Sequence, residues 1–234
     1  MKNNLTKLKW DSNFFSKNIA ELHITNGDEL ENPEFQSNHY DLIVTKQHQD
    51  LHIETQGFEE TFKETKVIFS KYLNEIAHEI SHEIFDTDCF PKEDKYFFQL
   101  AYESGKYSRF LLDPGFGETK FKELYNLWVI NSLNKTFAVK TFFTMDENLG
   151  ATGFVTVQKS GKTAKIGLIA THPLLQGKGI GTCLLQRAEN YCIENGIGTM
   201  DIPTQEQNVG ACNFYQKMGY AVQERIILKH FWKK

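Results

Sequence analysis

The stretch IGLIATHPLLQGKGIG, residues 166–181, decides the fold. It reads as the end of an apolar strand, a short loop, and a glycine-rich entry into a helix. Gly177, Gly179 and Gly181 alternate along that entry, so a ligand can approach the backbone closely. Backbone N–H groups and the helix dipole together favour a pyrophosphate there. The G-x-G-x-G spacing matches neither the Walker A loop nor the dinucleotide fingerprint, and an ordinary glycine-rich turn is the plain alternative.

Two motifs in this part of the chain resemble the GNAT N-acetyltransferase superfamily. Residues 176–181, QGKGIG, follow the Gln/Arg-x-x-Gly-x-Gly/Ala pattern that holds the pyrophosphate of acetyl-CoA in that family. Residues 208–220, NVGACNFYQKMGY, resemble its second segment, with Asn, Ala, Tyr, Lys and Gly at matching positions. The resemblance implies an α/β GNAT fold with a mixed, splayed central sheet flanked by helices, and acetyl-CoA as co-substrate.

Further segments resemble the dTDP-fucosamine acetyltransferase branch of the superfamily. They are TQEQN at 204–208, LKWDSNFF at 8–15, and SGKYSRF at 104–110. The resemblance is strongest from about residue 97 onward. It implies N-acetylation of an amino-deoxysugar nucleotide of the dTDP-4-amino-4,6-dideoxyhexose type, in surface polysaccharide biosynthesis. Another small amine or a protein N-terminus is the alternative acceptor.

The resemblance also implies roles for individual residues. Tyr215 is expected near the coenzyme sulfur, where a phenol can protonate the departing thiolate; a packing tyrosine beside Phe214 is the alternative. A backbone N–H of the strand ending at Thr171 is expected to stabilise the oxyanion. Asn208 suits both a coenzyme contact and a helix N-cap. The expected coenzyme-binding residues are Ile169, Ala170, Thr171, Gln176, Gly177, Lys178, Gly179, Ile180, Gly181, Thr182 and Asn208.

The acceptor side is less defined. A guanidinium suits a nucleotide diphosphate, and aromatic rings suit a sugar or base, although ion-pair and core roles are alternatives for each. The expected substrate contacts are Tyr107, Arg109, Trp128 and Thr204. The general base is left open among Asp11, His172, Asp201, Glu206 and a water chain.

A rival motif is His78-Glu79-Ile80-Ser81-His82, a literal HExxH, which is the signature of a zinc hydrolase. The helical spacing of apolar residues over 71–85 predicts a helix with both histidines turned to solvent. A catalytic zinc site needs histidines turned into a cleft and a third ligand, so no metal is expected. A coenzyme-binding module without turnover is a third alternative, which the presence of Tyr215 disfavours.

The remaining pattern predicts two units, an N-terminal α/β domain over 1–95 and a GNAT domain over 96–234, divided at the polar segment 86–94. The expected helices are 48–56, 71–85, 121–133, 180–194 and 209–218. The expected strands and extended stretches are 19–24, 40–45, 58–62, 66–70, 97–101, 107–112, 137–143, 153–158, 163–171, 199–203 and 220–232.

The composition disfavours several other classes of protein. The formal charge of −4 disfavours non-specific binding of nucleic acid. No apolar run approaches the ~20 residues that span a bilayer, so no membrane partner is expected. Four cysteines without metal spacing suggest reduced thiols in a cytoplasmic protein. The expected partner is a small sugar nucleotide, and a homodimer is left open.

Overall fold

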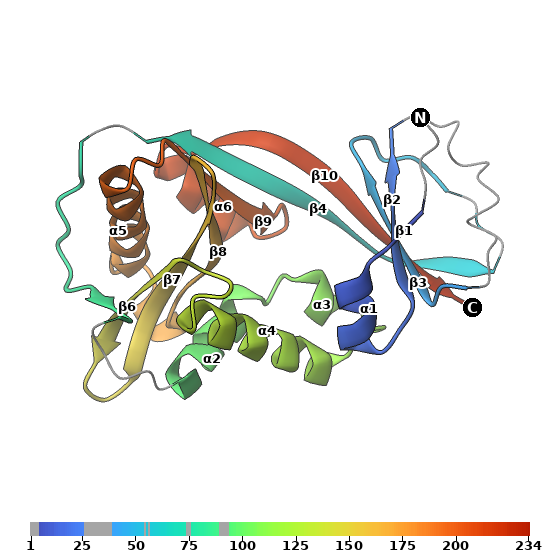
Figure 1. Cartoon of the computed structure of the whole chain (residues 1–234), viewed down its shortest axis with the longest axis horizontal. Helices are drawn as coiled ribbons and strands as arrows, with labels where there is room; N and C mark the ends of the chain where they lie inside the picture. Colours follow the sequence, from blue (N-terminus) through green and yellow to red (C-terminus); the bar gives the residue numbers. More distant parts are fainter. Residues whose placement is uncertain (1–4, 26–38, 54, 56, 74–75, 89–93) are drawn as a thin grey trace.

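The computed structural model describes residues 5–25, 39–53, 55, 57–73, 76–88 and 94–234. In this part of the chain, one mixed sheet has ten strands in the order β1-β2-β3-β10-β4-β9-β8-β7-β6-β5. Figure 1 shows the long strands β4 and β10 running side by side between the two ends of an elongated molecule.

The elements alternate between strands and helices along much of the chain. The first segment holds β1 (Thr6–Lys7), α1 (Lys9–Phe15), β2 (Ile19–Ile24), β3 (Leu42–Gln47), β4 (Phe58–Tyr72) and β5 (Phe85–Asp86). Three helices follow, α2 (Asp94–Ser104), α3 (Arg109–Leu112) and α4 (Glu118–Leu133). The last segment holds β6 (Lys140–Asp146), β7 (Gly150–Ser160), β8 (Thr163–Thr171), the 3-10 turn η3 (Pro173–Leu175), α5 (Ile180–Glu194), β9 (Thr199–Gln205), α6 (Val209–Lys217) and β10 (Ala221–Lys233).

The two faces of the sheet carry different helices. On one face, α5 and α6 bury residues such as Leu184 and Tyr215 against Val67 and Phe69 of β4. On the other face, α1 to α4 lie along the length of the molecule and share one core cluster with Leu168 of β8 and Leu228 of β10. Burial of each such apolar side chain stabilises the folded state by about 1.5–3 kcal/mol. Residues of both helical layers line a cleft at the gap between β8 and β9.

The sheet is continuous across the predicted division of the chain at residue 95. β10 pairs antiparallel with β3 and with β4, so a strand from the second predicted unit lies between two strands of the first. Part of the predicted boundary, residues 89–93 with Cys89, lies outside the described residues. The two-unit division stays a prediction.

Four of the local expectations are wrong. The predicted helix at 48–56 is non-helical where it is described. The described residues of the predicted helix at 71–85 are the end of β4, a loop over 76–84 and the start of β5. Residues 97–101 and 107–112 were expected to be extended but belong mainly to α2 and α3. In α2, helical spacing brings Phe97, Leu100 and Ala101 into the core, which outweighs the strand preference of its aromatic residues.

The expected splay of the central sheet is confirmed. β8 and β9 pair in parallel only between Thr163–Lys165 and Thr199–Asp201, although both strands continue further. A register shift between Val155 and Val157 of β7 marks a β-bulge in its pairing with β8. Beyond residue 165, β8 therefore presents an edge that no strand of the described chain covers.

Candidate active site

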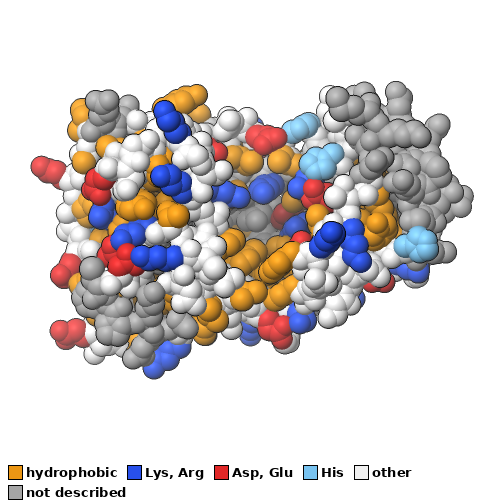
Figure 2. All heavy atoms as spheres, viewed as in Figure 1, with side chains coloured by type: hydrophobic (Ala, Val, Ile, Leu, Met, Phe, Trp, Pro, Cys, Tyr) orange, Lys and Arg blue, Asp and Glu red, His pale blue; other side chains and the backbone are white. Residues whose placement is uncertain are grey.

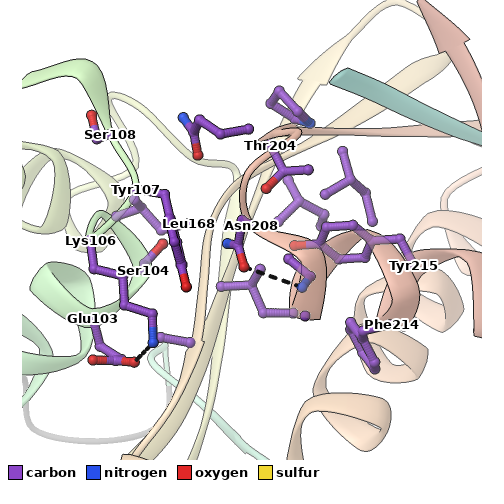
Figure 3. Close-up of a pocket in the computed structure, with 18 of the residues that line it drawn as sticks. Glu103, Ser104, Lys106, Tyr107, Ser108, Leu168, Thr204, Asn208, Phe214 and Tyr215 are labelled. Carbon is purple, nitrogen blue, oxygen red and sulfur yellow. Dashed lines mark hydrogen bonds and ion pairs between the residues drawn. The ribbon is translucent and has the colours of Figure 1, made fainter. Parts of the chain in front are cut away.

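A cleft of about 930 Å³ passes the gap between β8 and β9 and is lined from both layers of the molecule. Figure 2 shows the face of the molecule hollowed near its centre, with lysine or arginine side chains along one side and hydrophobic side chains along another. In Figure 3, residues 103–108 approach from one side of the strands, and Asn208, Phe214 and Tyr215 approach from the other. The two ends of the cleft have different chemistry.

The first end is built around the loop that enters α5. Gly177 and Gly179 have positive φ values of 78° and 85°, which glycine adopts without strain. Gly179 is the N-cap of α5 and has no side chain to accept from the first-turn N–H groups. Those groups and the helix dipole are therefore available to an anion. Gly181 does not have a positive φ, so its backbone conformation does not require glycine. What a glycine provides at this position is space beside the loop, where a Cβ would first meet Thr171 Oγ1 at 3.5 Å.

The free edge of β8 adds backbone groups to this end. The His172 N–H donates to the Thr152 carbonyl at 2.7 Å. Because backbone N–H groups alternate in direction along an antiparallel ladder, the N–H of Ala170 points toward β7, and those of Ile169 and Thr171 point toward the gap. Within the bulge, the Leu168 N–H donates to Thr156 Oγ1 at 2.8 Å. Ile169 is therefore a better placed oxyanion donor than Leu168.

Helix α6 supplies Asn208 and Tyr215. Asn208 is its N-cap, and its Oδ1 accepts from the Ala211 N–H at 3.2 Å, which leaves the amide NH₂ for a ligand. The Tyr215 ring is 5% exposed and packs 5.6 Å from Phe69, while its hydroxyl points toward the side where Asn208 and Thr204 lie (Figure 3). Burial raises the pKa of Tyr215 above its ordinary value, so the phenol is protonated at neutral pH.

The second end of the cleft contains a buried carboxyl group, Glu64 of β4. Its side chain points to the α1–α4 face because it pairs with Leu228, which lies in that core. Glu64 is 4% exposed, and its Oε2 has no hydrogen-bond partner in the described part of the chain. Burial raises the pKa of Glu64 to about 7, although Arg109 and Lys66 oppose this. A carboxylate of this pKa can accept a proton near neutral pH.

Two cations, Arg109 and Lys66, lie near this carboxyl group, and a third, Lys165, lies near Lys66. Lys66, Arg109 and Lys165 line the cleft, and none of the ion pairs in the described residues involves them. Burial, followed by repulsion from Lys165, Arg109 and Lys46, lowers the pKa of Lys66 to about 8. Lys66 and Arg109 are half-buried and Lys165 is exposed. Their positive charge exceeds the negative charge that the neighbouring Glu64 can carry, so this end favours an anionic ligand.

Arg109 is held by two buried side chains. Its Nη1 lies 3.3 Å from His230 Nε2, and His230 Nδ1 lies 2.5 Å from Asp113 Oδ2. Asp113 also accepts from Trp232 Nε1 at 2.8 Å, and both Asp113 and His230 are inaccessible to solvent. Burial lowers the pKa of His230 to about 4, so the ring is neutral at physiological pH. Nδ1–H can then donate to Asp113 while Nε2 accepts from Arg109.

The sequence model of the "Acetyltransferase (GNAT) family" matches residues 105–220. The chain belongs to the GNAT acetyltransferase family. The match includes the α5 entry loop, the splayed strands and α6, which are the elements that form the first end of the cleft.

Two curated relatives and one solved structure are similar to this GNAT protein. It is 29% identical over 126 residues to the dTDP-fucosamine acetyltransferase of Escherichia coli O6:H1, a match covering 53% of both chains. It is 26% identical over 134 residues to the spore coat polysaccharide biosynthesis protein SpsD of Bacillus subtilis, covering 57% of this chain and 46% of that one. The chain therefore spans about half the length of these relatives. A putative GNAT acetyltransferase from Novosphingobium aromaticivorans shares the fold, with a TM-score of 0.56, 10% identity, and coverage of 83% and 75%.

Most of the expected site residues of this GNAT protein lie in one cleft. All four expected substrate contacts line it, and so do the expected coenzyme-binding residues except Lys178, which is exposed. The expected general bases lie elsewhere. Asp11, His172, Asp201 and Glu206 are not among the described residues that line the cleft, and Glu206 is paired on the surface with Arg225 at 2.9 Å.

Sequence reasoning missed Glu64, Lys66 and the Asp113–His230 pair. Glu64 lies between the two predicted strands 58–62 and 66–70, and Lys66 begins the second of them, so the predicted pattern placed neither residue in a cleft. In the structure both lie within the single strand β4, and their position became evident only from its pairing with β9 and β10.

The HExxH segment is a loop that packs against α5. His78 Nε2 lies 2.6 Å from Glu189 Oε2, whereas His82 Nδ1 lies 3.3 Å from Cys183 Sγ. The argument from helical phase was therefore wrong, because neither histidine lies on a helix. The two imidazoles have different partners, and no group of three metal-binding side chains occurs among the described residues. Within the same residues, no helix is long and apolar enough to cross a bilayer.

Proposed function

We propose that this protein is an N-acetyltransferase that uses acetyl-CoA to acetylate the amino group of an amino-deoxysugar nucleotide in the biosynthesis of a surface polysaccharide. One observation carries the proposal. The cleft joins a glycine loop suited to a pyrophosphate with a group of three cations on the opposite face of the sheet, none of which forms an ion pair among the described residues. Two anionic ligands can thus meet at the gap between β8 and β9. The two curated relatives support the polysaccharide assignment by what their names state of them.

The fit to acetyl-CoA rests on shape and on backbone groups. A Cβ at Gly177 would meet no atom within 4 Å, so the loop has open space on its ligand side. The α5 N-terminus would bind the pyrophosphate, and the edge of β8 would pair with the amide groups of the pantetheine arm. The acetyl group would then lie beside Tyr215.

Acetyl transfer requires an unprotonated amine, and Glu64 is our proposed base. Its carboxylate would take a proton from the substrate ammonium, after which the amine lone pair attacks the thioester carbonyl carbon. The N–C bond forms, and the Ile169 N–H stabilises the oxyanion, an effect that can contribute about 3 kcal/mol. The C–S bond then breaks, and Tyr215 gives its proton to the coenzyme thiolate. The nitrogen loses its second proton as the amide forms, and that proton restores the Tyr215 phenol, directly or through water.

A thiol-release assay with acetyl-CoA and a panel of dTDP- and UDP-linked amino sugars tests this function. The expected result is turnover of at least one 4-amino-4,6-dideoxyhexose nucleotide and none of the corresponding hydroxy sugars. The product should gain one acetyl group on nitrogen by mass spectrometry. Turnover of polyamines or peptide N-termini, with no sugar nucleotide accepted, would refute the substrate assignment while leaving an acetyltransferase.

A further inference from the structure

We propose that Arg109, Lys66 and Lys165 form a diphosphate subsite at the Glu64 end of the cleft, and that the buried Asp113–His230 pair positions Arg109 for it. This proposal rests on the proposed function, because it assigns the phosphates of the sugar nucleotide to a defined group of residues. It adds positioning residues on β10 and on the turn after α3, which lie outside the cleft lining.

The first step in the argument is the separation of this group from the coenzyme loop. Lys66 pairs with Gln205 and Glu64 pairs with Leu228, so both side chains project to the α1–α4 face. The α5 entry loop packs with α5 on the other face. A coenzyme pyrophosphate on that loop would therefore leave the three cations available to a second anion.

The second step concerns charge. The described lining of the cleft contains six basic residues and two acidic ones, although the whole chain has a formal charge of −4. Lys46 and Lys106 have carboxylate partners, Glu21 and Glu103 respectively. The other cations at this end form no ion pair among the described residues, and burial, followed by repulsion from neighbouring cations, lowers the pKa of Lys66. A diphosphate supplies the missing negative charge, and a guanidinium can bind it with two parallel hydrogen bonds.

The third step concerns the orientation of Arg109. The guanidinium packs over the Phe110 ring at 4.7 Å and donates sideways to His230 Nε2, which is an acceptor only while the Nδ1 hydrogen faces Asp113. Asp113 is itself fixed by Trp232 and by the Gly115 N–H at 2.9 Å. A buried, fully hydrogen-bonded chain of this kind holds a long side chain in one rotamer, which lowers the entropic cost of binding.

The test is calorimetric titration of the full chain, saturated with CoA so that the coenzyme loop is filled, with dTDP and UDP and with thymidine and uridine as uncharged controls. At least one diphosphate should bind, and its nucleoside should bind at least tenfold more weakly. Arg109→Gln should weaken the diphosphate at least tenfold, about 1.4 kcal/mol, with CoA affinity unchanged. Lys122→Gln, which removes an exposed charge on α4, is the matched control and should have no effect.

The positioning role is tested at His230. The amide of His230→Gln can place an oxygen near the Nε2 position, so diphosphate affinity should stay within threefold. His230→Asn reaches only the Nδ1 position, so the same affinity should fall at least fivefold while CoA affinity is unchanged. Equal effects of both variants, or a parallel loss of CoA binding, would overturn the positioning role. If both variants unfold on heating earlier than the assay temperature, Asp113→Asn serves instead, and unchanged diphosphate affinity in it overturns the role.

The two proposals fail separately. Arg109-dependent binding of a diphosphate, with no amino-sugar nucleotide acetylated, would leave the subsite and refute the proposed function. Acetylation of such a nucleotide with unchanged KM in Arg109→Gln would support the proposed function and refute the subsite. Absence of any diphosphate binding to the CoA-saturated chain would overturn the subsite.

Discussion

The two ends of the cleft offer a ligand different kinds of groups. At the α5 end, they are backbone N–H and C=O groups of β8 and of the loop around Gly179, presented by glycines and by a helix N-terminus. At the β4 end, they are charged side chains from segments far apart in the chain, such as Glu64, Arg109 and Lys165. A backbone site tolerates change in the surrounding side chains. A side-chain site can change specificity by single substitutions, which suits a common coenzyme at one end and a family-specific acceptor at the other.

The largest effect is expected at the side-chain end. Glu64→Gln removes the proposed base, so turnover at pH 7 should fall by about 10³-fold. In the wild type, kcat/KM should decrease as pH falls below about 7, because Glu64 becomes protonated, and this limb should be absent from the variant. Glu103→Gln, which alters another carboxylate of the same cleft, is the control and should change turnover less than threefold. A Glu64→Gln enzyme with more than a tenth of wild-type turnover would exclude this base.

The same substitution should make the fold more stable at alkaline pH. The folded pKa of Glu64, about 7, lies above its ordinary value of 4.5, so ionisation opposes folding. The destabilisation is absent below pH 4.5 and is complete above pH 7. Urea unfolding at pH 8 should therefore show a gain of roughly 1–3 kcal/mol for Glu64→Gln and little change at pH 4. An equal loss of stability at both pH values would mean that the carboxylate has a structural partner.

Tyr215→Phe should have the next largest effect, and it lies where the two ends meet. The ring keeps its packing against Phe69, so only the proton donor is lost. Turnover should fall by about 10²-fold, while the affinity for acetyl-CoA stays within a few-fold. The alkaline limb of the rate profile should also disappear. Tyr191→Phe, on α5 beside Phe142, is a matched control, and wild-type turnover in Tyr215→Phe with chemistry limiting would refute the general-acid role.

Gly181→Val tests the backbone end. A Cβ at this position meets only Thr171 Oγ1 at 3.5 Å and Phe214 Cζ at 3.8 Å, so the fold should survive. The γ methyl groups would occupy space beside the anion site, so calorimetry should show at least tenfold weaker acetyl-CoA binding, about 1.4 kcal/mol. Gly198→Val, where a Cβ meets nothing within 4 Å, should leave the affinity unchanged. Equal affinities in the two variants would make the loop an ordinary turn.

The smallest effect is expected for Asn208→Asp. Asp is as good an N-cap as Asn, so thermal stability should change by less than 0.5 kcal/mol. The substitution removes the amide donor and adds a negative charge, so the KM for acetyl-CoA should rise about threefold to tenfold. Asn208→Ala provides the converse control, because it should cost about 1 kcal/mol through loss of the bond to the Ala211 N–H. An unchanged KM in Asn208→Asp would restrict Asn208 to capping.

The backbone end could be predicted from the sequence because its signals are local. β8 and α5 have the predicted bounds, and α6 begins at the predicted residue behind an Asn N-cap. Strand, loop and helix follow one another within a few residues, so each pattern contains its own start and stop.

Other segments depend on distant partners and could not be predicted in this way. Apolar residues spaced by about four, from Leu73 to Ile84, indicated a helix over 71–85. In the structure, Ile76 is 81% exposed, and Lys71 and His78 are tied to the buried Glu189 of α5 instead. An ion pair with a residue more than a hundred positions away overrides a local pattern, and one sequence does not reveal it.

The β4 end of the cleft was only partly predicted for a related reason. Arg109 was singled out by its chemistry, but His230, its partner, follows 121 positions later in β10. Glu64 fell between two predicted strands, and its burial became evident only once the order β10-β4-β9 was known. A buried charge is a property of the assembled sheet, whereas a glycine turn is a property of a few residues.

The place of β10 in the sheet has a consequence for biosynthesis. β3 and β4 are separated in the sheet by a strand that begins only at Ala221, whereas β4 ends at Tyr72. At ribosomal rates of about 5–20 residues per second, roughly 7–30 seconds pass between the emergence of these two partners. During that time the facing edges of β3 and β4 have no strand between them and can pair with another nascent chain. The nascent protein is thus most exposed to aggregation just before its last strand is made, and slower translation of that final stretch would lengthen this interval.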